Sequence, residues 1–310
     1  MAQRRMGRLS LVLALMFPIA ADTLAQDAQT DLRRDAQRRL NISGRQRMLS
    51  QRIAKAACFA TRFPGQGDSA KEMQEARALF VSSMKALRSG SAEIGLAAET
   101  DAEVLPALNI AAELADQYDS SLVAFASAPP EKLGTGKLET IYDMSLPLLT
   151  ALNDVVDQLQ AKHEDGRIVR LGLAQAINVS GRQRMFSQKM SKELCMIALG
   201  HRVQGTRAHL AGTVALFEAS HQTLKQGLTG LNLIEKDSSA ISAQLSVIEH
   251  HWQKLGEIFR RVAGGGDPSE ADLGTVASDN TMLLVELNRA VEMYESIDIP
   301  AELTATTSRK

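Results

Sequence analysis

The sequence predicts an all-α protein built from two tandem antiparallel four-helix bundles related by a pseudo-two-fold axis. Residues that suit helices, such as Ala, Leu and Met, are abundant, and aromatic residues make up only 4% of the chain. Strand-forming residues never gather into alternating runs separated by hairpin turns. An eleven-residue segment recurs in the second half of the chain, and each copy is surrounded by helical stretches with short connections.

The repeat is close enough to indicate a duplication. Residues 41–51 are Asn-Ile-Ser-Gly-Arg-Gln-Arg-Met-Leu-Ser-Gln, and residues 178–188 differ only by Val for Ile and Phe for Leu. The same offset of 137 residues relates Cys58 to Cys195, which are the two cysteines of the chain. Chance explains both matches poorly, so we interpret each half of the chain as one copy of a common unit.

Four helices are expected in each copy, with glycine and proline marking most of the ends. The expected helices cover about residues 31–61, 69–88, 101–126 and 136–163, then 166–199, 205–228, 233–262 and 268–296. Few helix breakers lie between His163 and Gly166, so the fourth helix is expected to continue almost directly into the fifth. Pro268 suits the first turn of the last helix.

The N-terminus has the pattern of a secretory signal. Arg4, Arg5 and Arg8 precede the apolar stretch Leu9–Ala21, and Thr23-Leu24-Ala25 offers a small-x-small cleavage site. We therefore expect residues 1–25 to be a cleaved signal peptide, although a retained membrane anchor is the alternative. The predicted domains are then residues 26–164 and 165–300, followed by a disordered tail over 301–310.

The repeated segment places its polar residues on one face of a helix. At 100° per residue, Arg47 and Cys58 share a stripe with Gln51 beside it, and the second copy repeats this with Arg184, Gln188 and Cys195. If the cysteines form a disulfide, rather than remain two buried thiols, the two helices lie parallel and the two arginines face one another.

Two facing guanidinium groups repel unless an anion bridges them, and their planar forks suit an oxyanion. Gly44 and Gly181, each inside a helix, would permit close approach of the two backbones. Asn41 and Asn178, together with the two glutamines, could supply further contacts. The predicted ligand-binding residues are thus Arg47, Arg184, Gly44, Gly181, Asn41, Asn178, Gln51 and Gln188.

The pattern Asn-x-Ser-Gly-x-x-Arg-Met-x-Ser, followed by a basic, Ala-rich helix, resembles the periplasmic N-terminal sensor domain of PilJ-type pilus chemoreceptors and NarX-type nitrate sensor kinases. The resemblance implies a four-helix bundle that dimerises through its first helix. In the nitrate-sensing members, the arginine of the Arg-Met pair from each protomer holds one nitrate, which implies this role for Arg47 and Arg184. This chain departs from the nitrate kinases at Arg45-Gln46 and Arg182-Gln183, where they have a small and an apolar residue.

The expected function is therefore periplasmic binding of a small oxyanion such as nitrate or nitrite. Because the related receptors continue into a membrane span and a signalling module, we expect a separate membrane receptor, sensor kinase or transporter to be the partner. The alternative is a helical interaction or adaptor protein of a pilus, chemosensory or transport system, in which Gly44 and its neighbours form a packing seam without a ligand.

Other function classes lack support in the sequence. No Gly-rich phosphate loop, Gly-x-Ser-x-Gly elbow or His-Glu-x-x-His motif is present, so we expect no enzymatic activity and no cofactor. The six histidines are scattered, which speaks against a metal site. A net charge of −1 speaks against binding to nucleic acid.

Overall fold

The computed structural model describes residues 17–65, 67–127, 135–170, 172–227 and 235–298. Within these ranges the regular elements are helices, and the residues between them contribute one isolated bridge, from Ser91 to Leu96. This confirms the predicted all-α class. The helices are α1 (Phe17–Arg62), α2 (Ser69–Ser89), α3 (Val104–Ala126), α4 (Thr135–Asp165), α5 (Leu173–Ala198), α6 (Val203–Gly227), α7 (Glu235–Ala263) and α8 (Glu270–Glu295).

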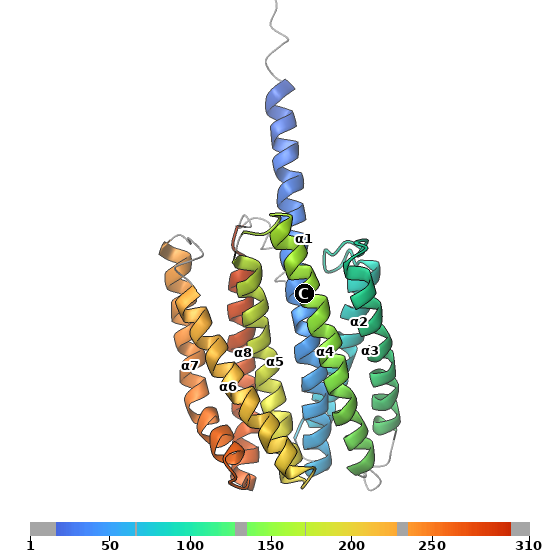
Figure 1. The fold of residues 1–310 in the computed structure, drawn as a ribbon, viewed down its shortest axis with the longest axis vertical. Coiled ribbons are helices and arrows are strands. Elements are labelled where there is room, and N and C mark those ends of the chain that lie inside the picture. Colours follow the sequence, from blue (N-terminus) through green and yellow to red (C-terminus); the bar gives the residue numbers. More distant parts are fainter. Residues whose placement is uncertain (1–16, 66, 128–134, 171, 228–234, 299–310) are drawn as a thin grey trace, which may run out of the picture.

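The helices form two groups of four, and α1 and α5 lie at the centre (Figure 1). Helix α1 packs against α2 and α4, with α3 against α4, and α5 packs against α6 and α8, with α7 against α8. The most extensive helix–helix contact joins α1 to α5, so the two groups share one continuous hydrophobic core. The division into two separate domains stays a prediction.

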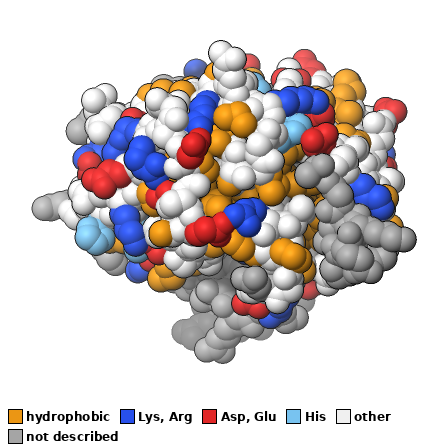
Figure 2. Space-filling view, turned by 90° about the horizontal axis from the view of Figure 1, so that it is seen from below, with side chains coloured by type: hydrophobic (Ala, Val, Ile, Leu, Met, Phe, Trp, Pro, Cys, Tyr) orange, Lys and Arg blue, Asp and Glu red, His pale blue; other side chains and the backbone are white. Residues whose placement is uncertain are grey.

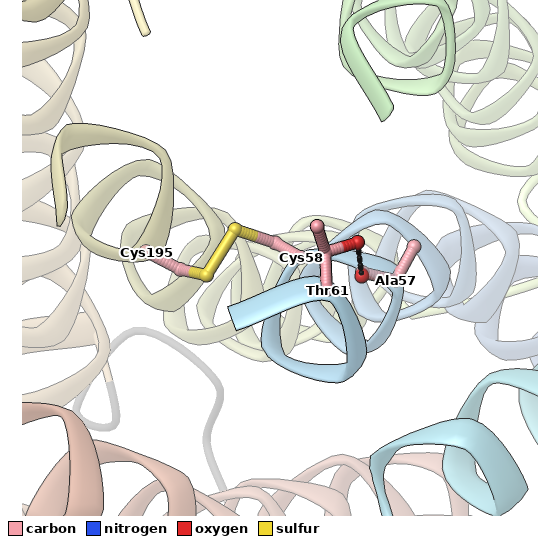
Figure 3. The surroundings of a disulfide bond; sticks show 4 residues. All are labelled: Ala57, Cys58, Thr61 and Cys195. Atoms are coloured by element: carbon pink, nitrogen blue, oxygen red, sulfur yellow. Dashed lines mark hydrogen bonds between the residues drawn. A yellow bond between two sulfur atoms is a disulfide. The ribbon is translucent and has the colours of Figure 1, made fainter. Parts of the chain in front are cut away.

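The central helices α1 and α5 run side by side in the same direction. Near their C-terminal ends, a disulfide joins Cys58 to Cys195 with their Cα atoms 6.2 Å apart (Figure 3). Some four turns earlier, Gly44 and Gly181 approach so closely that a Cβ built on either glycine would lie 3.9–4.0 Å from the Cα of the other. Equivalent residues of the two copies thus meet, as an isologous contact requires. The pseudo-two-fold axis itself stays a prediction.

The disulfide lies inside the protein. Both Cys58 and Cys195 have 0% of their surface exposed. At the end of the molecule where α1 and α5 finish, hydrophobic side chains gather in the middle and charged ones lie around them (Figure 2). The predicted pairing of the two cysteines is confirmed.

Helix α1 begins earlier than the sequence indicated. It starts at Phe17 and its N-terminal part extends beyond the two bundles, where Leu32 is 63% exposed (Figure 1). Residues 1–16 of the expected signal peptide, and the expected tail from residue 301, lie outside the described residues. Cleavage after Ala25 therefore stays a prediction. Among the described helices, none combines the length and apolar character that a membrane span requires.

The expected continuation of the fourth helix into the fifth is wrong. Helix α4 ends at Asp165, and the chain then turns before α5 begins at Leu173. Gly172 adopts a left-handed conformation with φ of 79°, and Arg167 also has a positive φ. The buried side chain of Val169 anchors the turn between them. Packing at Val169 and the left-handed Gly172 together set this boundary.

The last helix begins after Pro268 rather than with it. Ser269 is the N-cap, and its hydroxyl oxygen accepts a hydrogen bond from the backbone N–H of Asp272. The carboxylate of Asp272 accepts one from the backbone N–H of Ser269, which completes a capping box. This reciprocal pair fixes the start of the helix, so the expected place of Pro268 in its first turn is wrong.

Candidate functional site

Two buried arginines mark the contact between α1 and α5. Arg47 on α1 has 0% of its surface exposed, and Arg184 on α5 has 3%. They are equivalent positions of the repeat, and the parallel arrangement of the two helices brings them to the same level. Burial of a single guanidinium is unusual, because charged side chains seldom lie fully inside a protein unless they are paired.

Each arginine donates to the asparagine of the opposite copy. Arg47 Nη2 lies 2.8 Å from Asn178 Oδ1 and 3.3 Å from the Asn178 carbonyl oxygen. Arg184 Nη2 lies at the same two distances from Asn41 Oδ1 and the Asn41 carbonyl oxygen. The two predicted asparagines are therefore next to the arginines, but their oxygens face the guanidinium groups as acceptors.

The outer helices α4 and α8 supply one further acceptor to each arginine. Arg47 Nη1 donates to Asn153 Oδ1 at 3.1 Å, and Arg184 Nη1 donates to Asn288 Oδ1 at 3.3 Å. Neither asparagine was predicted from the sequence. The signal that could have found them is a second, weaker repeat, Leu-Asn-x-x-Val-[Asp/Glu], which starts at residues 152 and 287.

The two guanidinium groups converge where the glycines cross. A Cβ built on Gly44 would lie 3.3 Å from Arg47 Nη2 and 3.6 Å from Arg184 Nη2, and one on Gly181 would lie 3.4 and 3.5 Å from the same atoms. Both Nη2 atoms are thus at most about 7 Å apart, a distance at which two unit charges repel by roughly 2 kcal/mol for an effective dielectric of about 20. Because Gly44 and Gly181 have only a hydrogen atom as their side chain, the guanidinium groups can approach this close to the two helix backbones.

Neither arginine has a carboxylate partner among the described residues. The ion pairs of the described chain include no carboxylate within 4.0 Å of either guanidinium. No atom in the described part of the chain accepts a hydrogen bond from the buried Nε of Arg47 or Arg184. Burial lowers the pKa of Arg47 to about 9 and that of Arg184 to about 10, so both remain cationic at neutral pH. Two like charges are thus buried together with neutral oxygens as their contacts.

The predicted glutamines lie one turn closer to the disulfide and contact other groups. Gln51 Nε2 donates to the Ser145 carbonyl oxygen at 3.2 Å, while its Oε1 accepts from Lys192 Nζ at 2.7 Å. Gln188 Nε2 donates to Ser187 Oγ at 3.2 Å, and its Oε1 is buried without a partner. In the described structure, neither glutamine therefore forms a hydrogen bond with Arg47 or Arg184.

Lys192 is a third buried cation at this contact. It has 0% of its surface exposed, donates to Ser145 Oγ at 2.9 Å and lies 4.6 Å from the centre of the Tyr142 ring. Burial lowers the pKa of Lys192 to about 7. Its equivalent in the first copy, Lys55, instead forms an ion pair with Glu72 at 2.8 Å. The two copies therefore differ in the contacts of this lysine, which lies between the arginine and the disulfide along each helix.

The other arginine of each motif points away from the convergence. Arg45 Nη2 donates to Ser83 Oγ at 3.2 Å, and Arg182 forms a partly exposed ion pair with Asp157 at 3.3 Å. This agrees with the sequence-based expectation that these two arginines make structural or surface contacts.

Comparison with known proteins identifies the family. The family model described as "Type IV pili methyl-accepting chemotaxis transducer N-term" (PilJ) matches residues 28–140 and again residues 169–275, one segment in each half of the chain. The methyl-accepting chemotaxis protein McpN of Pseudomonas aeruginosa is 34% identical over 122 residues, which are 39% of this chain and 22% of McpN. The matched part therefore spans less than a quarter of that relative's length. No solved structure matches the chain. With two segments that together cover most of its length, the chain belongs to the family of N-terminal domains of type IV pili methyl-accepting chemotaxis transducers.

Proposed function

We propose that the protein is a periplasmic sensory protein that binds one small oxyanion, such as nitrate or nitrite, between Arg47 and Arg184. The observation that carries the proposal is the pair of buried guanidinium groups with converging Nη2 atoms, neither of which forms an ion pair with a carboxylate of the described residues. An anion at this point would cancel the repulsion between the two cations and pair a charge that burial otherwise leaves uncompensated.

Binding would exchange weak acceptors for a stronger one. In the structure each Nη2 atom donates to a neutral asparagine oxygen at 2.8 Å, and neither Nε atom has an acceptor within the ranges that the structure describes. An anion would add the attraction between opposite charges to these hydrogen bonds, which a neutral asparagine oxygen does not supply. A planar oxyanion can accept from both guanidinium forks, so its arrival would release Asn41 and Asn178.

Release of the asparagines suggests how binding could be sensed. Asn178 also contacts Gln160 on α4, and Asn41 also contacts Glu295 on α8. An anion that displaces the asparagines would therefore change contacts from the central pair to both outer helices. Family membership favours a membrane-bound partner, which we propose is a receptor, a sensor kinase or a transporter, and the protein itself performs no chemistry on the anion.

Thermal unfolding in the presence of nitrate tests the proposal. Nitrate at millimolar concentration should raise the melting temperature of the wild-type protein, because a ligand that binds only the folded state stabilises it. Arg47→Ala and Arg184→Ala should abolish that shift. Arg45→Ala is the matched control, since it removes an arginine of the same motif that donates to Ser83, and it should keep the shift.

The adaptor alternative makes a different prediction for the same measurement. A helix-packing seam without a ligand would give no response to nitrate, nitrite or chloride in the wild-type protein. The arginine substitutions would then alter the melting temperature equally with and without anion, and this outcome would refute the proposed site.

A further inference from the structure

The two arginines have equivalent direct contacts, but the asparagines that accept from them donate to different kinds of residue. Asn178, which accepts from Arg47, donates through Nδ2 to Gln160 Oε1 at 2.7 Å. Asn41, which accepts from Arg184, donates through Nδ2 to a carboxylate oxygen of Glu295. Gln160 and Glu295 occupy equivalent positions, seven residues after Asn153 and Asn288. The shorter hydrogen bond from Asn178 Nδ2 thus ends at a neutral amide, whereas the one from Asn41 Nδ2 ends at a carboxylate.

Glu295 is largely enclosed. Its side chain, on α8, is 20% exposed and contacts Asn41 and Arg38 on α1. Arg38 Nε on α1 is 3.9 Å from Glu295 Oε1, and Glu292 is the neighbouring carboxylate on α8. Burial raises the pKa of Glu295, whereas the Asn41 hydrogen bond and the charges of Arg38 and Arg184 act in the opposite direction.

In the first copy the position equivalent to Glu295 holds the uncharged Gln160. The carboxylate nearest to the asparagine there is Asp157, whose Oδ1 lies 3.3 Å from Asn178 Nδ2. The side chain of Asp157 is 57% exposed and already forms an ion pair with Arg182. Both carboxylates have an arginine partner, so they differ in exposure: solvent screens the charge of Asp157 more strongly than that of Glu295.

We infer that Glu295 is a specificity-determining residue, which makes the site select singly charged oxyanions over doubly charged ones. The inference rests on the proposed function. The largely enclosed carboxylate of Glu295 repels each negative charge that a ligand brings, so it disfavours a divalent anion about twice as much as a monovalent one. Glu295 also holds the Asn41 amide with its oxygen toward Arg184, which links the carboxylate to the ligand position.

Calorimetric titration with nitrate and sulfate tests this role. Wild type should bind nitrate more tightly than sulfate. Glu295→Gln introduces the residue type found at position 160, and it should narrow the preference for nitrate over sulfate by at least about tenfold, because removing one nearby negative charge favours a divalent anion twice as much. Wild type and variant are compared by the ratio of their nitrate and sulfate affinities. Effects of anion shape are the same in both proteins and cancel in that comparison.

Two further variants complete the experiment. Gln160→Glu adds a carboxylate at the equivalent position and should weaken sulfate binding more than nitrate binding, the opposite change in the ratio. Asp279→Asn removes the same formal charge from the surface of α8, where Asp279 pairs with Lys254, and should leave the ratio unchanged. Because Gln160→Glu tests the same idea in the other direction, a folding defect in one variant does not remove the test.

The outcomes separate this inference from the proposed function. If wild type binds nitrate and the ratio is the same in Glu295→Gln and Gln160→Glu, the role of Glu295 is refuted and the anion site stands. If neither wild type nor Glu295→Gln binds any anion, the anion site is refuted and the role of Glu295 with it. Sulfate binding that appears or strengthens in Glu295→Gln alone supports the inference.

Discussion

Replacement of Gly44 by alanine separates an anion site from a packing seam. The added Cβ would lie 3.3 Å from Arg47 Nη2 and 3.6 Å from Arg184 Nη2, but 4.0 Å from the nearest backbone atom, the Cα of Gly181. The first two atoms are the ends of flexible side chains and can shift by a few tenths of an ångström, and the third distance is an ordinary contact. The helices therefore have room for a methyl group.

Stability and ligand binding should consequently change in different ways. Alanine favours a helix interior by about 1 kcal/mol over glycine, so Gly44→Ala should leave the free energy of unfolding unchanged or raise it by up to about 1 kcal/mol. The methyl group would occupy the point on which both guanidinium groups converge, where an anion needs oxygens about 2.8 Å from the donors. We expect nitrate affinity to fall by at least about tenfold, or roughly 1.4 kcal/mol.

Urea unfolding with and without nitrate measures both effects. Gly212→Ala on α6 is the matched control, since Gly212 is exposed and a Cβ there would meet nothing within 4 Å. It should gain stability without losing the nitrate response. A loss of more than about 2 kcal/mol in Gly44→Ala without nitrate, accompanied by an unchanged nitrate response, would show that the glycine serves packing alone and would refute the reasoning.

Two further predictions concern the rest of the α1–α5 contact. Replacing Cys58 and Cys195 together by serine should lower the free energy of unfolding by about 2–5 kcal/mol, as measured in urea, because the disulfide closes a loop of 137 residues; an unchanged midpoint would contradict this. The pKa of Lys192 is lowered from 10.5 to about 7, so between these pH values the unfolded chain binds more protons and stability rises with pH. Lys192→Met should reduce that slope by up to about 1.4 kcal/mol per pH unit, whereas the surface control Lys254→Met should keep it.

Sequence patterns predicted the central pair of helices because a duplication records which residues are equivalent. The repeat at residues 41–51 and 178–188, with the matched Cys58 and Cys195, was sufficient to place two helices in parallel and two arginines at one level. Most helix bounds followed from glycine and proline. Helix ends depend on neighbouring residues, and the equivalence of the two copies depends on one constant offset. Both can therefore be recognised in the sequence without the structure.

Contacts between residues of helices far apart in the sequence could not be predicted from those patterns. Asn153 and Asn288 belong to helices far from the motif in sequence, and their repeat is weaker and has an offset of 135 rather than 137 residues. The glutamines share the arginine stripe on a helical wheel, but the buried ammonium of Lys192 accounts for the orientation of Gln51. The turn between α4 and α5 depends on packing at Val169 and a left-handed Gly172, which composition alone did not indicate.

A crystal structure of the protein grown with nitrate, at a concentration well above its calorimetric dissociation constant, would show whether an anion binds between the two arginines. We expect one nitrate between Arg47 and Arg184, with both Nη2 atoms turned from the asparagine oxygens to the anion. Intact bonds from the arginines to Asn41 and Asn178, with nitrate elsewhere or nowhere in the protein, would contradict it.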